Sequence, residues 1–596
     1  MVSIEIFVDK RDKGEHDGIG MEARPIFTGF FDATIFFHIA ETPSAQNLDA
    51  LGGIRTPNNS FEGWCDIHFT TRARMKKIPQ KLRKCQFSAM LGGMKNALVI
   101  PQEVRDVVVK LAGAGHEAYP VGGCVRDLLR GVVPKDWDVA TSAKPEEIAA
   151  LFPESFYENK FLTVTVKTGS DDPALAEVEI TTFRAEGRYT DKRHPDEVRF
   201  AGTLEEDLSR RDFTVNAMAL DIGSFQTKSG TDSRLSLESV IDPFGGQEDL
   251  KNRLIRAVGD AEERIGEDAL RMMRAARMAT ELDFEIESAT GVAVRGRAGS
   301  LEMIAKERIR DEFVKIIATP RAREGVELLH DLGLLAYIMP ELEQGIGMVN
   351  RPKILTVWEH NLKALEYGAK SGYAPLVRIA ALLHDVGKPL TRGPMKNGEW
   401  TFYGHDMAGA KIAARILERL RFPRETLEKI ATLIRWHLFK YDPDEGITDS
   451  SIRRLIRRVG ADNMNDLVRV RICDRMGMGV PKALPYRLRH FQFRVEKILR
   501  EEEAPSVKKL AIKGDDIMRE LGIGPGVRIG KIMEVLLQEA MDDPAKNERG
   551  HLLSRLREIG GLSDEELVAR AEEAESKVEL SEDERIGAIK RKYFVK

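Results

Sequence analysis

The chain has 596 residues, too many for one hydrophobic core, and this length predicts three or four domains. Its 91 Lys and Arg residues nearly balance 95 Asp and Glu, which excludes a globally basic nucleic-acid binder, so any RNA has to bind local basic patches. Four cysteines without CxxC spacing argue against a disulfide framework or a zinc ribbon and favour a reducing cytoplasm.

Residues 1–93 are the least regular part of the chain. They mix Gly, Pro, Asn and isolated aromatic residues without a sustained period of 2 or 3.6. The most apolar stretch, 27–40, is short and carries Asp32, and we find no secretory signal, so we expect no membrane segment. We interpret residues 1–93 as an unassigned extension, with Met94 opening the organised chain; a small extra domain is the alternative.

From Met94 to about residue 243, helical and strand patterns alternate. A helical pattern that ends at glycine precedes the first strand, and a Gly-Gly turn opens a second helix after it. These elements predict a small mixed sheet with helices packed on it. The predicted strands are residues 118–121, 136–141, 161–169 and 176–183.

After residue 244 the pattern is helical, with no convincing strand down to the C-terminus. The predicted fold class is therefore α+β, a mixed-sheet head followed by an all-α body and tail. The domains that we predict are an extension (1–93), a head (94–243), a helical neck (244–345), a second helical domain (346–480) and a helical tail (481–596).

Three features of the head suit a triphosphate and divalent ions. Gly122 and Gly123 precede a helix, where backbone N–H groups approach a phosphate, and Arg126 adds a charge-assisted contact one turn later. Asp136 and Asp138 are two residues apart on a strand and project from the same face. Paired carboxylates suit Mg²⁺, and two such ions would clamp the attacking and leaving oxygens of a phosphoryl transfer.

A Gly-Gly turn or an Asp-x-Asp pair alone usually has only a structural role. The two in this order are a far more specific sign of a functional site. The stretch GGCVRDLLRGVVPKDWDVAT resembles the signature of the class II tRNA nucleotidyltransferase and bacterial poly(A) polymerase family. The resemblance runs from about Val99 to Arg277 and implies a polymerase-β-like head. It continues through VEITTFRAEGRY, EEDLSRRDFTVNAMAL, IDPFGGQEDL and ERIGEDALRMMRAARMA.

This resemblance implies roles for individual residues. The metal ligands fall on the two aspartates of the Asp-x-Asp pair, and the triphosphate contacts fall on the glycine turn and Arg126. Arg211 falls on a further nucleotide contact. Glu179 matches a third acidic partner or base, and an ordinary surface residue of a strand is an equally good interpretation of it.

The helix EDALRMMRAAR carries charged residues at steps of three on one face: Asp268, Arg271, Arg274 and Arg277. Spacing alone favours a solvated, salt-bridged helix, whereas the family resemblance implies a helix that reads the incoming base. A carboxylate only accepts hydrogen bonds and a guanidinium only donates them. Asp268 would accept from the amino group of cytosine or adenine and Arg271 would donate to the ring nitrogen. Guanine and uracil would present a carbonyl oxygen to Asp268.

Residues 185–200, AEGRYTDKRHPDEVRF, are polar and rich in charge. They resemble the flexible loop of the family, which relatives that add only C lack. This loop favours an enzyme that adds the final A, and an ordinary surface hairpin loop is compatible with the same sequence.

A second constellation lies further along the helical part, in VWEHNL, LLHDVGKP, FYGHDMAGA, LIRWHLF and ICDRMG. These motifs resemble the HD phosphohydrolase superfamily. Mixed imidazole and carboxylate ligands suit Mn, Ni, Co or Fe better than Mg, and a metal-bound water would hydrolyse a phosphoester. The pair His330-Asp331 has the same local sequence without the partners, and we expect it in helical packing. The resemblance implies core ligands at His360, His384, Asp385 and Asp474, and positions for a second metal at His405 and His437.

Two basic segments leave two interpretations open. GIGPGVRIG, in the tail, is similar to an RNA-holding stretch of the family, where Arg528 or Lys531 would touch phosphate, but it also suits a simple helix–helix connection. SIRRLIRRVG, upstream, suits either phosphate contacts or solvated helix faces.

The sequence thus predicts an enzyme that adds or repairs the 3′-terminal CCA of tRNA from CTP and ATP. The tRNA would be held by shape and backbone contacts, and the HD domain would hydrolyse phosphomonoesters or 2′,3′-cyclic phosphates at damaged RNA ends. The alternatives are a poly(A) polymerase, an A-adding enzyme of a split system, an RNA-binding scaffold whose only enzyme is the HD hydrolase, and an HD nucleotide-signalling hydrolase. The intact acidic and Arg residues of the head argue against the scaffold.

Overall fold

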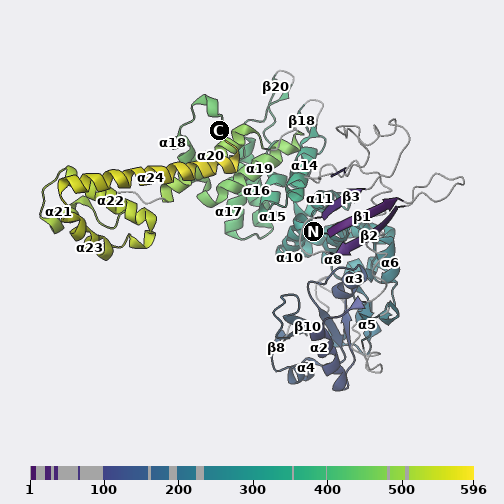
Figure 1. Ribbon diagram of the computed structural model, residues 1–596. Helices are drawn as coiled ribbons and strands as arrows, with labels where there is room; N and C mark the ends of the chain where they lie inside the picture. Colours follow the sequence, from purple (N-terminus) through teal and green to yellow (C-terminus); the bar gives the residue numbers. More distant parts are fainter. Residues whose placement is uncertain are drawn as a thin grey trace. The chain divides into compact units, whose positions relative to one another are not determined.

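The structure of the chain is a computed structural model (Figure 1). By contacts the chain divides into two compact units, Met1–Ile100 with Ser229–Ser239, and Pro101–Lys228 with Val240–Lys596. The residues described are 2–8, 21–27, 33–37, 65–66, 98–158, 163–186, 198–222, 234–235, 237–351, 355–396, 399–479, 484–503 and 509–595.

The first unit contains a four-stranded sheet in the order β2-β1-β3-β4 and a separate antiparallel pair, β5 with β14. These four strands belong to the extension that we predicted over residues 1–93; the other residues of the extension lie outside the described part of the chain, and its boundary at Met94 stays a prediction. The strands are β1 (Val2–Val8), β2 (Met21–Phe27), β3 (Ala33–Phe37), β4 (Cys65–Asp66), β5 (Leu98–Val99) and β14 (Arg234–Leu235).

The second unit begins with a seven-stranded mixed sheet in the order β15-β13-β6-β7-β10-β9-β8. Only the central pair β7–β10 is parallel, and the other pairs are antiparallel. The strands are β6 (Ala118–Val121), β7 (Asp138–Thr141), β8 (Ser155–Glu158), β9 (Thr163–Lys167), β10 (Glu177–Thr182), β13 (Ala219–Leu220) and β15 (Val240–Ile241).

Alternation along β10 sets the two faces of this sheet. Val178 and Ile180 are fully buried, while Glu177 and Glu179, which alternate with them, are exposed. Helices α2 (Gln102–Gly113), α3 (Gly123–Leu129), α4 (Pro145–Leu151), α5 (Leu204–Ser209) and α6 (Gly246–Asn252) complete the head. The sheet therefore offers one polar face on which carboxylates can gather.

A short antiparallel pair, β11 (Arg184–Glu186) with β12 (Val198–Phe200), contains both ends of the predicted loop 185–200. Residues 187–197, which make up most of that loop, lie outside the described residues. Its role in switching from C to A therefore stays a prediction.

Among its described residues, the remainder of the second unit is helical, as predicted, except for three two-stranded pairs with two or three residues per strand. These are β16 (Leu254–Ile255) with β17 (Glu285–Ile286), β18 (Val349–Arg351) with β19 (Leu355–Thr356), and β20 (Met395–Lys396) with β21 (Glu399–Trp400). The neck helices are α7 (Ala261–Glu267), α8 (Leu270–Leu282), α9 (Ser288–Arg297), α10 (Lys306–Ala318), α11 (Ala322–Asp331), α12 (Leu335–Ile338) and α13 (Pro340–Glu343).

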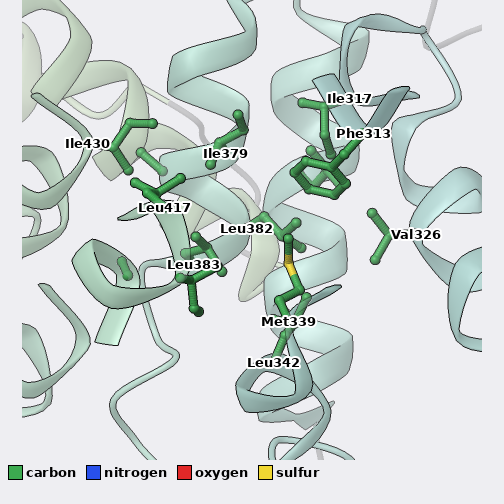
Figure 2. Close-up of a cluster of buried hydrophobic side chains, with 14 of the residues drawn as sticks. Phe313, Ile317, Val326, Met339, Leu342, Ile379, Leu382, Leu383, Leu417 and Ile430 are labelled. Carbon is green, nitrogen blue, oxygen red and sulfur yellow. The ribbon is translucent and has the colours of Figure 1, made fainter. Parts of the chain in front are cut away.

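The next helices carry the HD motifs and pack on the neck without a break in the core. Apolar side chains from the neck and from these helices form one buried cluster across the domain boundary that we predicted at residue 346 (Figure 2). The buried Arg378 strengthens the junction, because its Nη1 donates to the carbonyls of Ile317, Ala318 and Thr319 at the end of α10, each at 2.9 Å. The helices are α14 (Val357–Lys370), α15 (Pro375–Leu383), α16 (His405–Arg419), α17 (Arg424–Trp436), α18 (Asp449–Val459) and α19 (Met464–Gly477).

The tail has a hydrophobic core of its own, built mainly from α22, α23 and the first part of α24. None of the described helices combines the length and the apolar character that crossing a membrane requires. The tail helices are α20 (Tyr486–Glu503), α21 (Gly514–Leu521), α22 (Val527–Asp542), α23 (Arg549–Gly560) and α24 (Asp564–Tyr593).

Candidate nucleotidyl-transfer and metal centres

The glycine turn lies against the predicted nucleotide-binding arginines. Gly122 has φ 79°, in the left-handed region, and its N–H donates to the carbonyl of Met218 at 3.1 Å. A Cβ at this position would lie 2.7 Å from Nη1 of Arg211 and 3.8 Å from Oδ2 of Asp138. The positive φ therefore favours glycine here, and a Cβ would displace the Arg211 guanidinium.

The carboxylates predicted to hold metal gather at the start of two neighbouring parallel strands. Asp138 opens β7 and is in register with Glu179 of β10, and Asp136 lies in the bend two residues before the strand. Trp137 between the aspartates is buried, so Asp136 and Asp138 turn away from the core. Burial raises the pKa of Asp138 to about 6; Arg211 opposes this effect, and the Glu179 and Asp136 carboxylates add to it.

A chain of hydrogen bonds joins the predicted triphosphate contacts to the helix that we predicted to read the base. Nη1 of Arg126 donates to Oδ1 of Asn216 at 2.8 Å, and Nδ2 of Asn216 donates to Oδ1 of Asp212 at 3.2 Å. Oδ2 of Asp212 accepts from Nε of Arg274 at 2.7 Å. Although burial opposes it, Arg274 holds the pKa of Asp212 at about 2, so this carboxylate is ionised and fixes α8 to the glycine turn.

Asp268 and Arg277, which we also predicted to read the base, do not lie side by side on one helix face. Asp268 is not in a helix: it lies between α7 and α8, where its Oδ1 accepts from the N–H of Leu270 at 2.9 Å and its Oδ2 pairs with Arg308 at 3.1 Å. Arg277 pairs with Glu312 of α10 at 2.5 Å. These contacts spread the four residues over different partners rather than along one solvated stripe.

Arg271 is largely buried, and its guanidinium already has partners. Its Nη1 donates to the Arg264 carbonyl at 2.8 Å and to the Glu267 carboxylate, and its Nη2 donates to the Arg210 carbonyl at 3.1 Å. Sequence alone could not reveal the Arg210 contact, because it joins residues 61 positions apart.

The six predicted HD residues meet in one buried centre. Nε2 of His360 lies 3.0 Å from Nε2 of His384, 3.2 Å from Oδ2 of Asp385 and 3.3 Å from Oδ1 of Asp474. On the other side of Asp385, Oδ1 lies 3.3 Å from Nε2 of His405 and 3.9 Å from Nε2 of His437. Asp385 thus bridges two sets of ligands, as expected for a site that extends to a second metal.

Backbone contacts fix which imidazole nitrogen faces the centre. Nδ1 of His384, His405 and His437 lies 2.6–2.7 Å from the carbonyl three residues earlier, so Nδ1 of each ring carries a proton and Nε2 faces the centre. Nε2 of His405 and of His437 is buried without a hydrogen-bond partner. Buried lone pairs beside a bridging carboxylate fit a divalent metal ion.

The electrostatics of this centre agree with that fit. Against the effect of burial, the Asp385 and Asp474 carboxylates raise the pKa of His384 to about 10. Burial, with a contribution from His384, lowers the pKa of His437 to about 4. The negative charge of Asp385 and Asp474 therefore favours a cation at the place where the imidazoles converge. Within the described part of the chain, the groups of three or more ligand residues with atoms all within 4.8 Å are both in this centre, so the head carboxylates are not such a group.

Sequence reasoning missed two basic residues at this centre. Lys388 pairs with Oδ2 of Asp385 at 2.5 Å and donates to Oδ1 of Asn350 at 2.8 Å, and Arg471 pairs with Oδ2 of Asp474 at 2.8 Å. Both lie three residues from an acidic ligand in the sequence, and this spacing could have indicated them. The Asn350 contact carries no such signal. His330 instead pairs with Glu343 at 2.6 Å in the neck, as expected for a residue outside the metal centre.

The predicted RNA contact Arg528 is used inside the tail. Its Nη2 donates to the carbonyls of Gly560 at 3.1 Å and Leu562 at 2.6 Å, and Nη1 pairs with Asp564. Lys531 pairs with Glu534 at 2.9 Å. These contacts favour the simpler interpretation, a helix–helix connection.

Three protein families match successive parts of the chain. The family described as the poly A polymerase head domain matches residues 118–256. The probable RNA and SrmB-binding site of polymerase A matches residues 283–346, and the HD domain matches residues 357–476.

Two relatives are matched over most of their own length. The chain is 34% identical over 434 residues to the A-adding tRNA nucleotidyltransferase of Deinococcus radiodurans, covering 70% of this chain and 90% of that protein. It is 31% identical over 464 residues to the CCA-adding enzyme of Lactococcus lactis, covering 77% of this chain and 98% of that enzyme.

Other relatives match mainly through the head and neck. The chain is 42% identical over 250 residues to the CCA-adding enzyme of Geobacillus thermodenitrificans, covering 41% of this chain and 56% of that enzyme, so it spans about half the length of this relative. A crystal structure of the Bacillus stearothermophilus CCA-adding enzyme in complex with CTP is 28% identical, with a TM-score of 0.49, covering 77% of this chain and 96% of that one.

The mixed-sheet head and the buried ligand set define the class: a nucleotidyltransferase head joined through a helical neck to an HD metal-binding domain. The chain belongs to the class II tRNA nucleotidyltransferase (CCA-adding enzyme) family, with which the poly(A) polymerase head is shared.

Proposed function

We propose that this protein adds the 3′-terminal CCA to tRNA from CTP and ATP. The observation that carries the proposal is the cluster of Asp136, Asp138 and Glu179 beside the glycine turn and Arg211. The relative from Lactococcus lactis, aligned over 98% of its length, is a CCA-adding enzyme and supports it.

In this mechanism the 3′ hydroxyl oxygen of the tRNA attacks the α-phosphorus of the incoming nucleotide. A new phosphodiester bond forms, the bond between the α- and β-phosphates breaks, and pyrophosphate leaves. The hydroxyl proton passes to a carboxylate of the cluster or to water. Asp136 and Asp138 would hold Mg²⁺, which would neutralise charge on the triphosphate, while Arg126 and Arg211 would orient the leaving phosphates.

Selection of the base would rest on Asp268 and Arg271. Nη1 of Arg271 donates to the Glu267 carboxylate in this structure. This hydrogen bond has to break before Arg271 can donate to a base. Loss of either side chain is expected to remove the preference for C and A over G and U. An unchanged preference in both Asp268→Ala and Arg271→Ala would contradict this assignment.

The decisive test is incorporation into tRNA that ends at its discriminator base, with CTP and ATP supplied separately and together. A CCA-adding enzyme needs CTP first, whereas an A-adding enzyme, the activity of the relative from Deinococcus radiodurans, extends only tRNA that already ends in CC. A poly(A) polymerase adds long A tails. Asp136→Ala with Asp138→Ala is expected to abolish incorporation, and retained incorporation would contradict the mechanism.

We also propose that the HD centre hydrolyses phosphate esters at RNA ends, with Mn, Ni, Co or Fe held by the imidazoles and carboxylates described above. Elemental analysis of the purified protein identifies the metal, and His384→Ala is expected to lose it. We propose a cytoplasmic location, which agrees with the free and buried Cys124 and Cys473.

A further inference from the structure

The carboxylate of Asp268 is held at both of its oxygens. Oδ1 accepts from the N–H of Leu270 at 2.9 Å, and Oδ2 accepts from Nη2 of Arg308 at 3.1 Å. The first donor belongs to the same turn of the chain, whereas Arg308 lies 40 residues further on, in the first turn of α10. The Asp268 side chain is 15% exposed, so the carboxylate is restrained without being closed off from solvent.

Arg308 donates from a helix that is itself fixed against α8. Phe313 of α10 is fully buried in the hydrophobic cluster to which α8 also contributes. Glu312, one turn after Arg308, is buried, and its carboxylate accepts from Nε of Arg277 at 2.5 Å. Packing and this second ion pair therefore hold α10 in place, and the helix presents the Arg308 guanidinium at a defined position beside Asp268.

The two arginines of α8 that follow Asp268 are committed to other carboxylates. Arg271 donates to Glu267, and Nη2 of Arg274 pairs with Oδ2 of Asp212 at 2.6 Å. Restraint of Oδ2 of Asp268 therefore falls to Arg308 from the neighbouring helix.

A carboxylate with a fixed orientation discriminates between bases better than one that can rotate. Each carboxylate oxygen has two lone pairs, so Oδ2 can accept from Arg308 and from the amino group of cytosine or adenine together. Guanine and uracil place a carbonyl oxygen in the same position, where two acceptors would then face each other. A carboxylate that is free to rotate would turn away from that oxygen, and the penalty against the wrong base would fall.

We propose that Arg308 is a positioning residue for base selection: by holding Oδ2 of Asp268, it keeps the carboxylate directed so that a wrong base meets an acceptor. Arg308 touches no substrate in this role and acts through Asp268. The inference rests on the proposed nucleotidyl transfer and adds to it a residue of α10 that controls which bases are accepted.

The test measures selectivity separately from rate, in the full chain. Values of kcat/KM are determined for ATP and GTP on tRNA that ends in CC, and for CTP and UTP on tRNA that ends at its discriminator base. Arg308→Ala is expected to lower the ratios, ATP over GTP and CTP over UTP, by about 10- to 150-fold, the range for one hydrogen bond to a charged group. A merely structural role would slow all four nucleotides alike, and ratios equal to those of wild type would overturn the proposal.

A double variant shows whether Arg308 acts through Asp268. Once Asp268 is absent, Arg308 has no carboxylate to hold, so Asp268→Ala combined with Arg308→Ala should be no less selective than Asp268→Ala alone. A further loss of selectivity in the double variant would count against the proposal.

Arg310→Ala is the matched control, because Arg310 lies on the same helix and its guanidinium pairs with Asp311 and donates to the Arg421 carbonyl. This variant is expected to keep the wild-type ratios. An equal loss in Arg310→Ala would trace the effect to α10 as a whole and refute the role given to Arg308.

A binding measurement separates this inference from the proposed function. If the wild-type chain transfers no nucleotide, the proposed function fails, and selectivity is then measured by equilibrium dialysis as the Kd for UTP divided by the Kd for CTP. A ratio that falls in Arg308→Ala and not in Arg310→Ala supports the positioning role. The same ratio in wild type and Arg308→Ala would rule that role out.

Discussion

Substitution of Gly122 by alanine tests the contact on which the head site depends. The backbone at Gly122 is in the left-handed region, and the new Cβ would lie 2.7 Å from Nη1 of Arg211. Because the clashing atom is the end of a flexible side chain, we expect the protein to fold and the Arg211 guanidinium to move instead. The guanidinium would then lose its position beside Asp138.

The expected effect has two parts of different size. The unfavourable φ costs about 1–3 kcal/mol of stability, as for other non-glycine residues in such conformations. Displacing one preorganised charged donor from the triphosphate lowers kcat on the order of 10²- to 10³-fold. The loss of activity should therefore exceed what the change in stability explains.

Gly131→Ala provides the matched control. Gly131 also has a positive φ, 70°, but a Cβ there would meet no atom within 4 Å. Single-nucleotide incorporation into tRNA and thermal unfolding are measured for both variants. Gly131→Ala should lose stability and keep its rate within a few-fold of wild type. Equal rates in the two variants would refute the idea that the turn positions Arg211.

Two further substitutions test other contacts of the structure. Asp212 has its pKa lowered from 3.8 to about 2, so the stability that it contributes is present above pH 3.8 and is lost as the pH falls towards 2. The difference in urea stability between wild type and Asp212→Asn should narrow by about 2 kcal/mol over that range, and a difference independent of pH would contradict the ion pair with Arg274. A Cβ at Gly387 would overlap the carbonyl oxygen of His405 and lie 2.5 Å from the nitrogen of Gly409, so Gly387→Ala should weaken metal binding at the HD centre about 10- to 100-fold, measured by competition with a chelator. Nucleotide incorporation by Gly387→Ala should stay near the wild-type rate, and loss of both activities would indicate general misfolding instead.

The sequence predicted the parts of the molecule that short-range patterns determine. The mixed-sheet head and the helical body follow from patterns along the chain, whereas the resemblance to HD phosphohydrolases implied that His360, His384, Asp385 and Asp474 meet. The glycine turn was predicted as well, because a Gly-Gly pair before a helix indicates a turn whose backbone N–H groups can approach a phosphate.

Partners distant in the chain were not predictable in this way. The family resemblance implied that Arg271 is an available donor, but its guanidinium donates to Glu267 and to the Arg210 carbonyl. Asp136 was expected on a strand, yet the strand begins at Asp138, where pairing with Glu179 starts. The pairing of strands and the burial of a guanidinium depend on tertiary packing, which one sequence does not encode locally.

The shared hydrophobic cluster of the neck and the HD helices links the two halves energetically. A ligand that binds only the folded state stabilises the whole cooperative unit to which its site belongs. The helix α8, which we expect to read the base, packs in the same hydrophobic cluster as the helices that carry the HD ligands. Metal binding at the HD centre should therefore protect α8 from local unfolding. The HD domain would thus serve the polymerase as a structural support even in the absence of any hydrolysis.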